Sequence, residues 1–223
     1  MTRRSTESAR YRSPFLAIVL LAACTAQPSS RSLASAAGSS SMQSDQARQD
    51  QIARGRFVVI THDCGGCHGG GSNPASTRWL DGMRDTINDV FHIGPFITRP
   101  KNLTPDNATG TGRFSERQIF NSLRYGLRPE ETPDVEITST VPGQGNFPLH
   151  PHYLAPPMPW DAWRHMPDQD LWAIAAYLKQ GVKPSNHRVP DSDGPPDFWA
   201  SAYTVQNIGA YPAVPYPTAS EKR

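Results

Sequence analysis

The stretch Cys64-Gly65-Gly66-Cys67-His68 carries the strongest chemical signal in the sequence. Two thiols at this spacing can each form a thioether with one vinyl group of a haem. The imidazole of His68, directly beside the second thiol, then faces the iron as its proximal ligand. We therefore predict one covalently attached haem, held by Cys64 and Cys67 and ligated by His68.

Two other kinds of site also use a Cys-x-x-Cys pair, and the sequence disfavours both. A zinc site could use Cys64, Cys67 and His68, but no further cysteine follows them, and the adjacent Cys67 and His68 do not match the usual spaced zinc-ligand pairs. A redox-active dithiol of the thioredoxin kind is expected in a βαβ setting. This motif instead lies between a predicted helix and a glycine-rich loop.

Ahead of the motif, the amino terminus has the order of an export signal. Four arginines within the first twelve residues are followed by a short apolar run, residues 15–23, and then by Cys24. The run is too short to span a bilayer, which takes about 20 helical residues. Because Leu21-Ala22-Ala23-Cys24 resembles a bacterial lipobox, we expect removal of residues 1–23 and lipidation of Cys24. A nearby cut by the ordinary signal peptidase and an uncleaved anchor are the alternatives.

A lipidated Cys24 would place the protein on a membrane of the bacterial periplasm. Stable anchoring needs more than one acyl chain, a condition that multiple acylation of Cys24 would meet. The next residue is Thr25, not the aspartate typical of inner-membrane retention in some Gram-negative bacteria. The outer membrane is therefore the favoured location.

The charge of the chain excludes one class of partner. The formal net charge is +2, from 22 basic and 20 acidic residues. Residues 1–23 contain four arginines and one glutamate, so their removal leaves 18 basic and 19 acidic residues, a net charge of −1. Such a chain offers no basic field for nucleic acid.

Composition divides the chain into four segments. Residues 1–23 are the export signal, and residues 24–44, rich in Ser, Ala and Gln, are predicted to be a flexible tether. Residues 45–183 are the predicted haem domain. Residues 184–223 form a Pro-rich tail with several aromatic residues, which we expect to pack on the domain.

The haem domain is predicted to have helices separated by long loops. The first helix runs from about Asp45 to Thr61, directly before the motif. Its apolar face is expected to carry Ile52, Phe57 and Ile60, with the small Gly55 between them. Residues 69–113 and 127–166 are read mainly as loops, since they are rich in Gly and Pro and show little periodicity.

Two further helices have clear start and stop signals. Ser115 is the expected N-cap of the second helix, with Gln118 three residues on in a capping-box pattern and Gly126 as the stop. The third helix runs from Asp168, its expected cap, to Gln180. Its apolar face follows helical spacing at Leu171, Ile174, Tyr177 and Leu178.

A second axial ligand would decide what the iron can do. Methionine raises the reduction potential relative to a second histidine and suits electron transfer. Met158 lies among prolines in Pro156-Pro157-Met158-Pro159-Trp160, a stiff and extended segment that could present its sulfur. Met166, just before the third helix, fits core packing better, and Met83 lies in a polar loop. The alternative ligands are four histidines: His150 and His152 first, then His92 and His165.

Together these motifs resemble class I cytochrome c. The resemblance rests on the haem motif, on Asn102-Leu103-Thr104-Pro105-Asp106, on Met158-Pro159-Trp160 and on the predicted helix from Asp170 to Leu178. More narrowly, the chain is similar to the cytochrome domains in membrane-associated cytochrome subunits of bacterial alcohol and aldehyde dehydrogenases, over roughly 46–182. Those subunits often carry two or three haem motifs, whereas this chain has one.

The resemblance implies an all-α fold, a class I cytochrome c-like domain of few helices around one haem c, with long Pro/Gly-rich loops. It implies Met158 as the distal metal ligand opposite His68. It also implies that Asn102 and Thr104 lie beside the haem. In this family the first and last helices cross near a small residue, a role that Gly55 and Phe57 would fill against Tyr177.

The expected function is single-electron transfer rather than catalysis by the chain itself. The resemblance implies an electron-accepting subunit or carrier for a dehydrogenase or respiratory chain, with redox proteins as partners. With His68 and Met158 both bound, the iron has no open position for a substrate. The alternative is a haem enzyme or small-ligand sensor, which needs a vacant or easily displaced distal position. A structural subunit with an incidental haem is the third reading.

Overall fold

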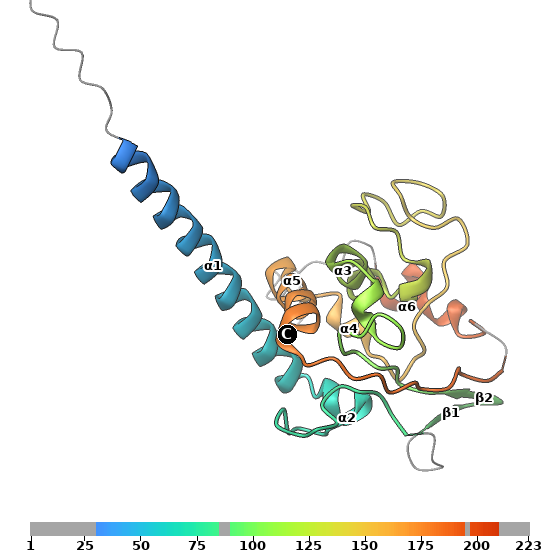
Figure 1. Ribbon diagram of the computed structural model, residues 1–223. Coiled ribbons are helices and arrows are strands. Elements are labelled where there is room, and N and C mark those ends of the chain that lie inside the picture. Colours follow the sequence, from blue (N-terminus) through green and yellow to red (C-terminus); the bar gives the residue numbers. More distant parts are fainter. Residues whose placement is uncertain (1–29, 85–89, 195–196, 210–223) are drawn as a thin grey trace, which may run out of the picture. The chain divides into compact units, whose positions relative to one another are not determined.

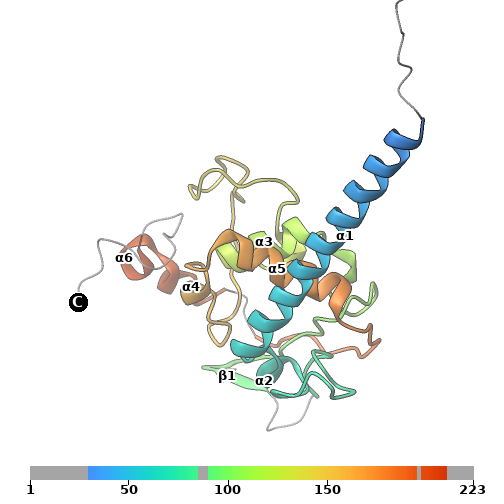
Figure 2. The same cartoon turned by 90° about the vertical axis from the view of Figure 1, so that its left-hand side faces the viewer.

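The computed structural model describes residues 30–84, 90–194 and 197–209, with side chains described from Met42 onward (Figures 1 and 2). The chain divides into two compact units, Met1–Ser41 and Met42–Arg223, which are described separately. The predicted export signal and Cys24 lie outside the described residues. No helix in the described ranges is long and apolar enough to cross a membrane.

Helix α1, Ser30–Thr61, ends where the sequence predicts but begins well before Asp45. Residues 30–44 are therefore helical, where an irregular tether was predicted. Helical hydrogen bonds are local, and a helix that has nucleated extends by one bond for each residue fixed. A lack of large apolar side chains argues against burial, but it does not stop a helix from extending.

Helix α1 packs against α5, Asp168–Ala176, at a crossing centred on Gly55. A Cβ added at Gly55 would lie 1.8 Å from the Ala173 carbonyl oxygen and 2.7 Å from Tyr177 Cβ, so only glycine allows this approach. The predicted role of Gly55 is thus confirmed. The predicted role of Phe57 is wrong, since its side chain is 55% exposed. Two residues beyond Gly55, it falls on the opposite side of the helix.

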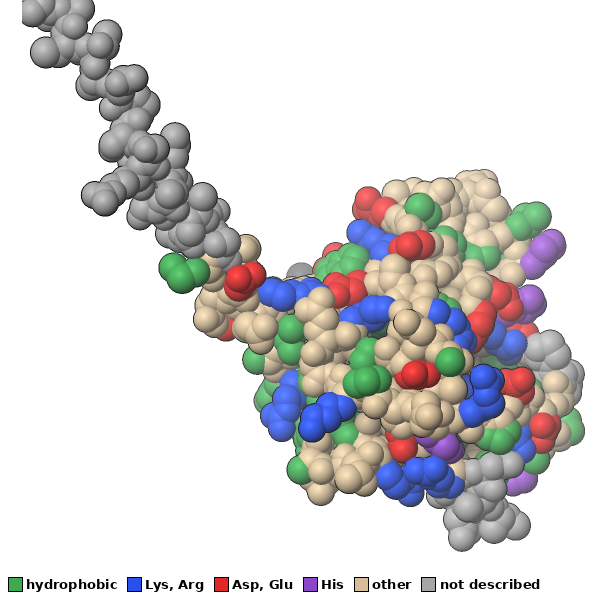
Figure 3. Space-filling view, viewed as in Figure 1, with side chains coloured by type: hydrophobic (Ala, Val, Ile, Leu, Met, Phe, Trp, Pro, Cys, Tyr) green, Lys and Arg blue, Asp and Glu red, His purple; other side chains and the backbone are tan. Residues whose placement is uncertain are grey.

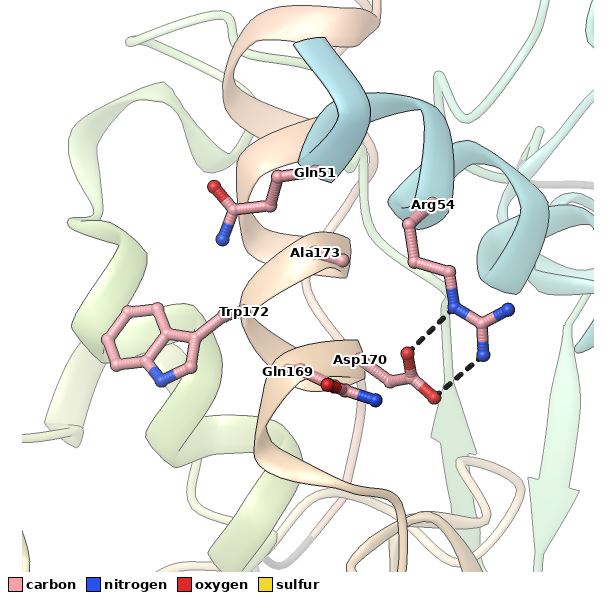
Figure 4. A pocket seen from close by; sticks show the side chains of 6 residues that line it. All are labelled: Gln51, Arg54, Gln169, Asp170, Trp172 and Ala173. Carbon is pink, nitrogen blue, oxygen red and sulfur yellow. Dashed lines mark hydrogen bonds and ion pairs between the residues drawn. The ribbon is translucent and has the colours of Figure 1, made fainter. Parts of the chain in front are cut away.

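An ion pair joins the two helices beside this crossing. Arg54 Nε and Nη2 donate to the two carboxylate oxygens of Asp170 at 2.8 and 2.9 Å, as the dashed lines in Figure 4 show. Hydrogen bonding to Asp170 raises the pKa of the Arg54 guanidinium. The pair borders a shallow hollow, which is also lined by Gln51 and Trp172.

Helix α3, Glu116–Tyr125, has the predicted capping box. Gln118 N donates to Ser115 Oγ at 3.0 Å, and Ser115 N donates to Gln118 Oε1 at 3.0 Å. The helix ends at Gly126, whose φ of 69° is left-handed. Glycine is also required there because a Cβ would lie 2.1 Å from the ring of Trp160. Both predicted ends of this helix are confirmed.

Helix α5 begins at Asp168 and continues past Ala176 as a π-helical turn, Tyr177–Gly181. Asp168 is not the cap as predicted, because Pro167 holds that position and the Asp168 carboxylate pairs instead with the buried Arg124. The predicted apolar face is confirmed. Its members are buried in the main core: Leu171, Ile174, Tyr177 and Leu178.

Helices dominate the described residues, but a two-stranded antiparallel sheet is also present. Strands β1, Phe91–Ile93, and β2, Phe96–Thr98, form a hairpin that pairs Phe91 with Thr98. Gly94, with a φ of 58°, makes the tight turn possible. The all-α prediction missed this sheet because strands of three residues are too short to show a recognisable alternation.

A second, aromatic core is separate from the main core, which Cys64 packs against. Trp160, the first residue of the short helix α4 (Trp160–Trp163), is fully buried and stacks on Tyr153. Phe96 of β2 and two residues of the carboxy-terminal segment, Trp199 and Tyr203, complete this core. Figure 3 shows basic and acidic side chains interspersed on the visible face rather than gathered into one basic field.

Candidate functional site

The haem motif forms the short helix α2, Cys64–His68, between the end of α1 and a glycine-rich loop. Asp63 before it has a left-handed φ of 49°, and Gly69 after it has a φ of 97°. Gly65 packs closely, since an added Cβ would lie 2.2 Å from Gly71 O and 2.4 Å from the Trp79 ring. The motif is thus held in one conformation by the loop that follows it.

The two thiols are free and partly buried. Burial raises the pKa of the Cys64 thiol to about 12 and also raises the pKa of Cys67. A redox-active Cys-x-x-Cys pair instead has a thiol whose pKa is lowered. Two cysteines beside a histidine, neither with a lowered thiol pKa, are a donor set that fits covalent haem attachment better than dithiol chemistry.

His68 is oriented by the backbone of a distant loop. Its Nδ1 lies 2.7 Å from the carbonyl oxygen of Lys101. A carbonyl can only accept, so Nδ1 carries the proton and the lone pair lies on Nε2. Burial lowers the pKa of His68, against the opposing effect of the bond to Lys101. A neutral imidazole with a free Nε2 is the form that ligates iron.

Asn102 and Thr104 follow Lys101 within three residues, and their side-chain polar atoms form hydrogen bonds with other parts of the protein. Their exposed fractions are 2% and 1%. Asn102 Nδ2 donates to Ser185 O at 2.7 Å, and Asn102 Oδ1 accepts from Thr104 Oγ1 at 2.7 Å. Both residues are therefore hydrogen-bonded to the segment after α5. They are connected to His68 indirectly, through Lys101, whose carbonyl accepts from the His68 ring.

Met158 borders the same main core that Cys64 packs against. The segment before it is not extended as predicted. Met158 N donates to Ala155 O at 2.9 Å, which closes a turn with Pro156 and Pro157 at its centre. Proline fixes φ near −65°, a value that suits turns as well as extended chains. Met166 is also partly buried against this core.

The four alternative histidines lie in different settings. His92 on β1 and His150 are exposed. His152 Nδ1 pairs with the carboxylate of Glu131, and His165 is half-buried. Within the side chains that the structure describes, no group of three or more His, Cys, Asp or Glu residues could hold a metal ion.

Sequence reasoning missed Lys101 as a member of the site. Lys101 acts through its backbone carbonyl, which every residue type has, so no side-chain pattern could have revealed it. Trp79 was also missed. Its Nε1 donates to the hydroxyl of Tyr177 at 2.9 Å and joins the loop after the motif to the end of α5. An aromatic residue within a glycine-rich loop was the available signal.

Comparison with known proteins finds relatives among cytochrome subunits of bacterial dehydrogenases. The chain is 26% identical over 152 residues to the fructose dehydrogenase cytochrome subunit of Gluconobacter japonicus, covering 68% of this chain and 26% of that protein. It is 24% identical over 162 residues to the alcohol dehydrogenase (quinone) cytochrome c subunit of Komagataeibacter europaeus, covering 73% and 28%. It is 26% identical over 151 residues to the gluconate 2-dehydrogenase cytochrome c subunit of Pantoea cypripedii, covering 68% and 28%.

These relatives are much longer than the region they share with this chain. The chain spans about a quarter of the length of each. No family model matches the chain. The resemblance predicted from the motifs is nevertheless confirmed, because the chain is similar to cytochrome c subunits of bacterial dehydrogenases, an alcohol dehydrogenase among them.

Proposed function

We propose that this protein is a mono-haem c-type cytochrome with a class I cytochrome c-like fold, which transfers single electrons. Its partner would be a bacterial dehydrogenase or another respiratory-chain component. The observation that carries the proposal is the orientation of His68, whose Nδ1 donates to Lys101 O, in a short helix that also contains Cys64 and Cys67. The similarity to cytochrome subunits of dehydrogenases supports the choice of partner.

Each residue of the proposed site has a distinct task. Cys64 and Cys67 would hold the haem covalently, and His68 Nε2 would be the proximal ligand. Met158 would be the distal ligand, presented by the turn that begins at Ala155. Haem c, when bound, supplies a one-electron Fe(III)/Fe(II) couple. The chain's own contribution would be to ligate the iron through His68 and Met158, to exclude substrates and to set the potential.

Covalent attachment is tested by acid–acetone extraction of the full-length protein expressed with its own export signal. Haem should stay with the polypeptide after denaturation and extraction, and the double variant Cys64→Ala/Cys67→Ala should lose it. Cys24→Ala is the matched control, since it removes the third cysteine and should keep the haem. Extractable haem in the unchanged protein would contradict the proposal.

The state of the iron separates electron transfer from the alternative function. A six-coordinate, low-spin ferric spectrum and no binding of carbon monoxide to the ferrous protein are expected for an electron carrier. A high-spin spectrum with ready ligand binding would instead indicate a haem enzyme or small-ligand sensor.

We also propose that the protein is a lipoprotein of the periplasm, anchored through Cys24 to a membrane, with the outer membrane favoured. The support is the lipobox-like Leu21-Ala22-Ala23-Cys24 after a short apolar run. Residues 24–44 would then separate the haem domain from the anchor. Mass spectrometry of the mature protein should find an acylated amino-terminal Cys24. An unmodified terminus at another residue would contradict this part of the proposal.

A further inference from the structure

Residues 185–193, here called the strap, follow α5 and run along residues 97–104 (Figure 1). Ile97 and Asp193 exchange two backbone hydrogen bonds of 3.2 and 2.8 Å. Arg99 Nη1 donates to Asp191 O at 2.7 Å, and Lys101 Nζ donates to Pro190 O at 2.7 Å. Residues 97, 99 and 101 thus all form hydrogen bonds with the strap. The last of them, Lys101, is the residue whose carbonyl accepts the hydrogen bond from His68 Nδ1.

The other end of the strap is held by buried groups. Asn102 Nδ2 donates to Ser185 O at 2.7 Å and to His187 O at 3.1 Å. Thr104 Oγ1 accepts from Ser185 N at 3.0 Å and donates to Asn102 Oδ1 at 2.7 Å. Bonds to buried groups are shielded from water, and breaking them leaves unsatisfied polar atoms. The strap is therefore attached most firmly at this end, through Asn102, which is the residue next to Lys101.

The strap also reaches the backbone on the other side of His68. His187 Nδ1 donates to Asp81 O at 2.8 Å, and Val189 packs against Gly82, where an added Cβ would lie 2.3 Å from Val189 Cγ2. Gly82 N in turn donates to the carbonyl oxygen of His68 at 2.7 Å. The ring of His68 is therefore hydrogen-bonded to Lys101, and its backbone to Gly82. The strap contacts both of these residues.

We propose that the strap fixes the Lys101 carbonyl against Nδ1–H of His68. It thereby sets how strongly this imidazole donates electrons to iron through Nε2. Asn102 would be the principal positioning residue. The inference rests on the proposed function, because donor strength matters only if His68 ligates iron. A firm bond at Nδ1 makes the ring a stronger donor through Nε2, which favours Fe(III) and lowers the reduction potential.

The test compares two buried asparagines in the full-length holoprotein. Asn102→Ala removes the bonds to the strap. Asn121→Ala is the matched control, since Asn121 is fully buried and its Nδ2 also donates to two carbonyls, those of Pro133 and Val135 at 2.9 Å, far from Lys101 in the sequence. Both variants should lose stability. Asn102→Ala alone should raise the reduction potential and speed the exchange of the His68 Nδ1 proton seen by NMR.

The outcomes separate the strap from the proposed function. If both variants keep covalent haem and the unchanged axial ligands, and their potentials shift equally or not at all, the strap proposal is wrong. If Asn102→Ala does not fold, Thr104→Val decides by the same readouts, since it keeps the side-chain shape and loses the bonds to Asn102 and Ser185. Absence of covalent haem in the unchanged protein would overturn the proposed function instead.

Discussion

The chain around His68 is joined to the strap by hydrogen bonds, whereas the chain on either side of the Met158 turn packs into the aromatic core. On the first side, the Lys101 carbonyl accepts from the ring, and Asn102 and Thr104 join the loop to the strap. On the second side, the ring of Trp160 packs against those of Tyr153 and Tyr203, at centroid distances of 5.7 and 4.8 Å. Hydrogen bonds are directional, but apolar packing is not.

This difference assigns different tasks to the two sides. Directional bonds can hold one nitrogen at a fixed angle, as a ligand whose electronic character matters requires. Apolar packing holds the shape of a segment and lets a flexible thioether adapt within it. Loss of a polar contact should therefore shift the properties of a site that still forms. Loss of an aromatic contact should weaken the attachment of the distal ligand itself.

The largest effect is expected on the aromatic side. Trp160→Ala should lower the free energy of unfolding by roughly 3–5 kcal/mol, because it empties a fully buried site. It should also weaken the absorption of the Met–Fe(III) bond, since Trp160 follows the Met158 turn. Denaturant unfolding and the ferric spectrum measure the two effects. Phe198→Ala is the control, as Phe198 belongs to the same aromatic group but is 45% exposed. Equal losses in both variants would contradict the account.

A smaller effect is expected from adding a methyl group within the haem motif. Gly65→Ala should cost about 1–3 kcal/mol of unfolding free energy, because the new Cβ meets the Gly71 carbonyl and the Trp79 ring. Gly66→Ala should lower the free energy of unfolding by clearly less than Gly65→Ala does. The atoms nearest to its Cβ belong to the carboxylate of Asp63, at 2.3 Å, and this exposed side chain can move away. The same measurement on both variants checks this order, and a reversed order would contradict the packing described for the motif.

The smallest effect is a dependence of stability on pH in the loop beside Asn102. Hydrogen bonds from the side chain and backbone of Thr109 lower the pKa of Asp106. A lowered pKa stabilises the folded state above the unfolded value of about 3.9, and this contribution is lost as pH falls through the folded value. Asp106→Asn should therefore flatten the fall in unfolding free energy as the pH drops below about 5. An unchanged pH dependence would show that Asp106 contributes nothing measurable.

Features that depend on neighbouring residues could be predicted from the sequence. The haem motif, the capping box of Ser115 and Gln118, and the stop at Gly126 each involve residues close in the chain. The apolar face of α5 was predictable for the same reason, since it follows from helical spacing. These are the parts of the fold where local chemistry and tertiary packing favour the same structure.

Features that no side-chain pattern records were not predictable from the residues, and the crossing at Gly55 was expected only from the family resemblance. The strap binds residues about eighty positions earlier, partly through backbone atoms that carry no side-chain signal. Phe57 was misplaced because a large apolar residue was assumed to face the core. The Met158 segment was predicted to be extended because proline stiffness was considered without the hydrogen bond to Ala155.

The central claim is that His68 and Met158 ligate one haem iron, and near-red absorption of the ferric holoprotein tests it most directly. A Met–Fe(III) charge-transfer band is expected in the unchanged protein. It should vanish in Met158→Ala, with covalent haem retained and a lower reduction potential. Met166→Ala is the control, because Met166 packs partly buried against the same core and should keep the band. A band that survives in Met158→Ala would contradict the claim and move the distal ligand to another methionine, Met166.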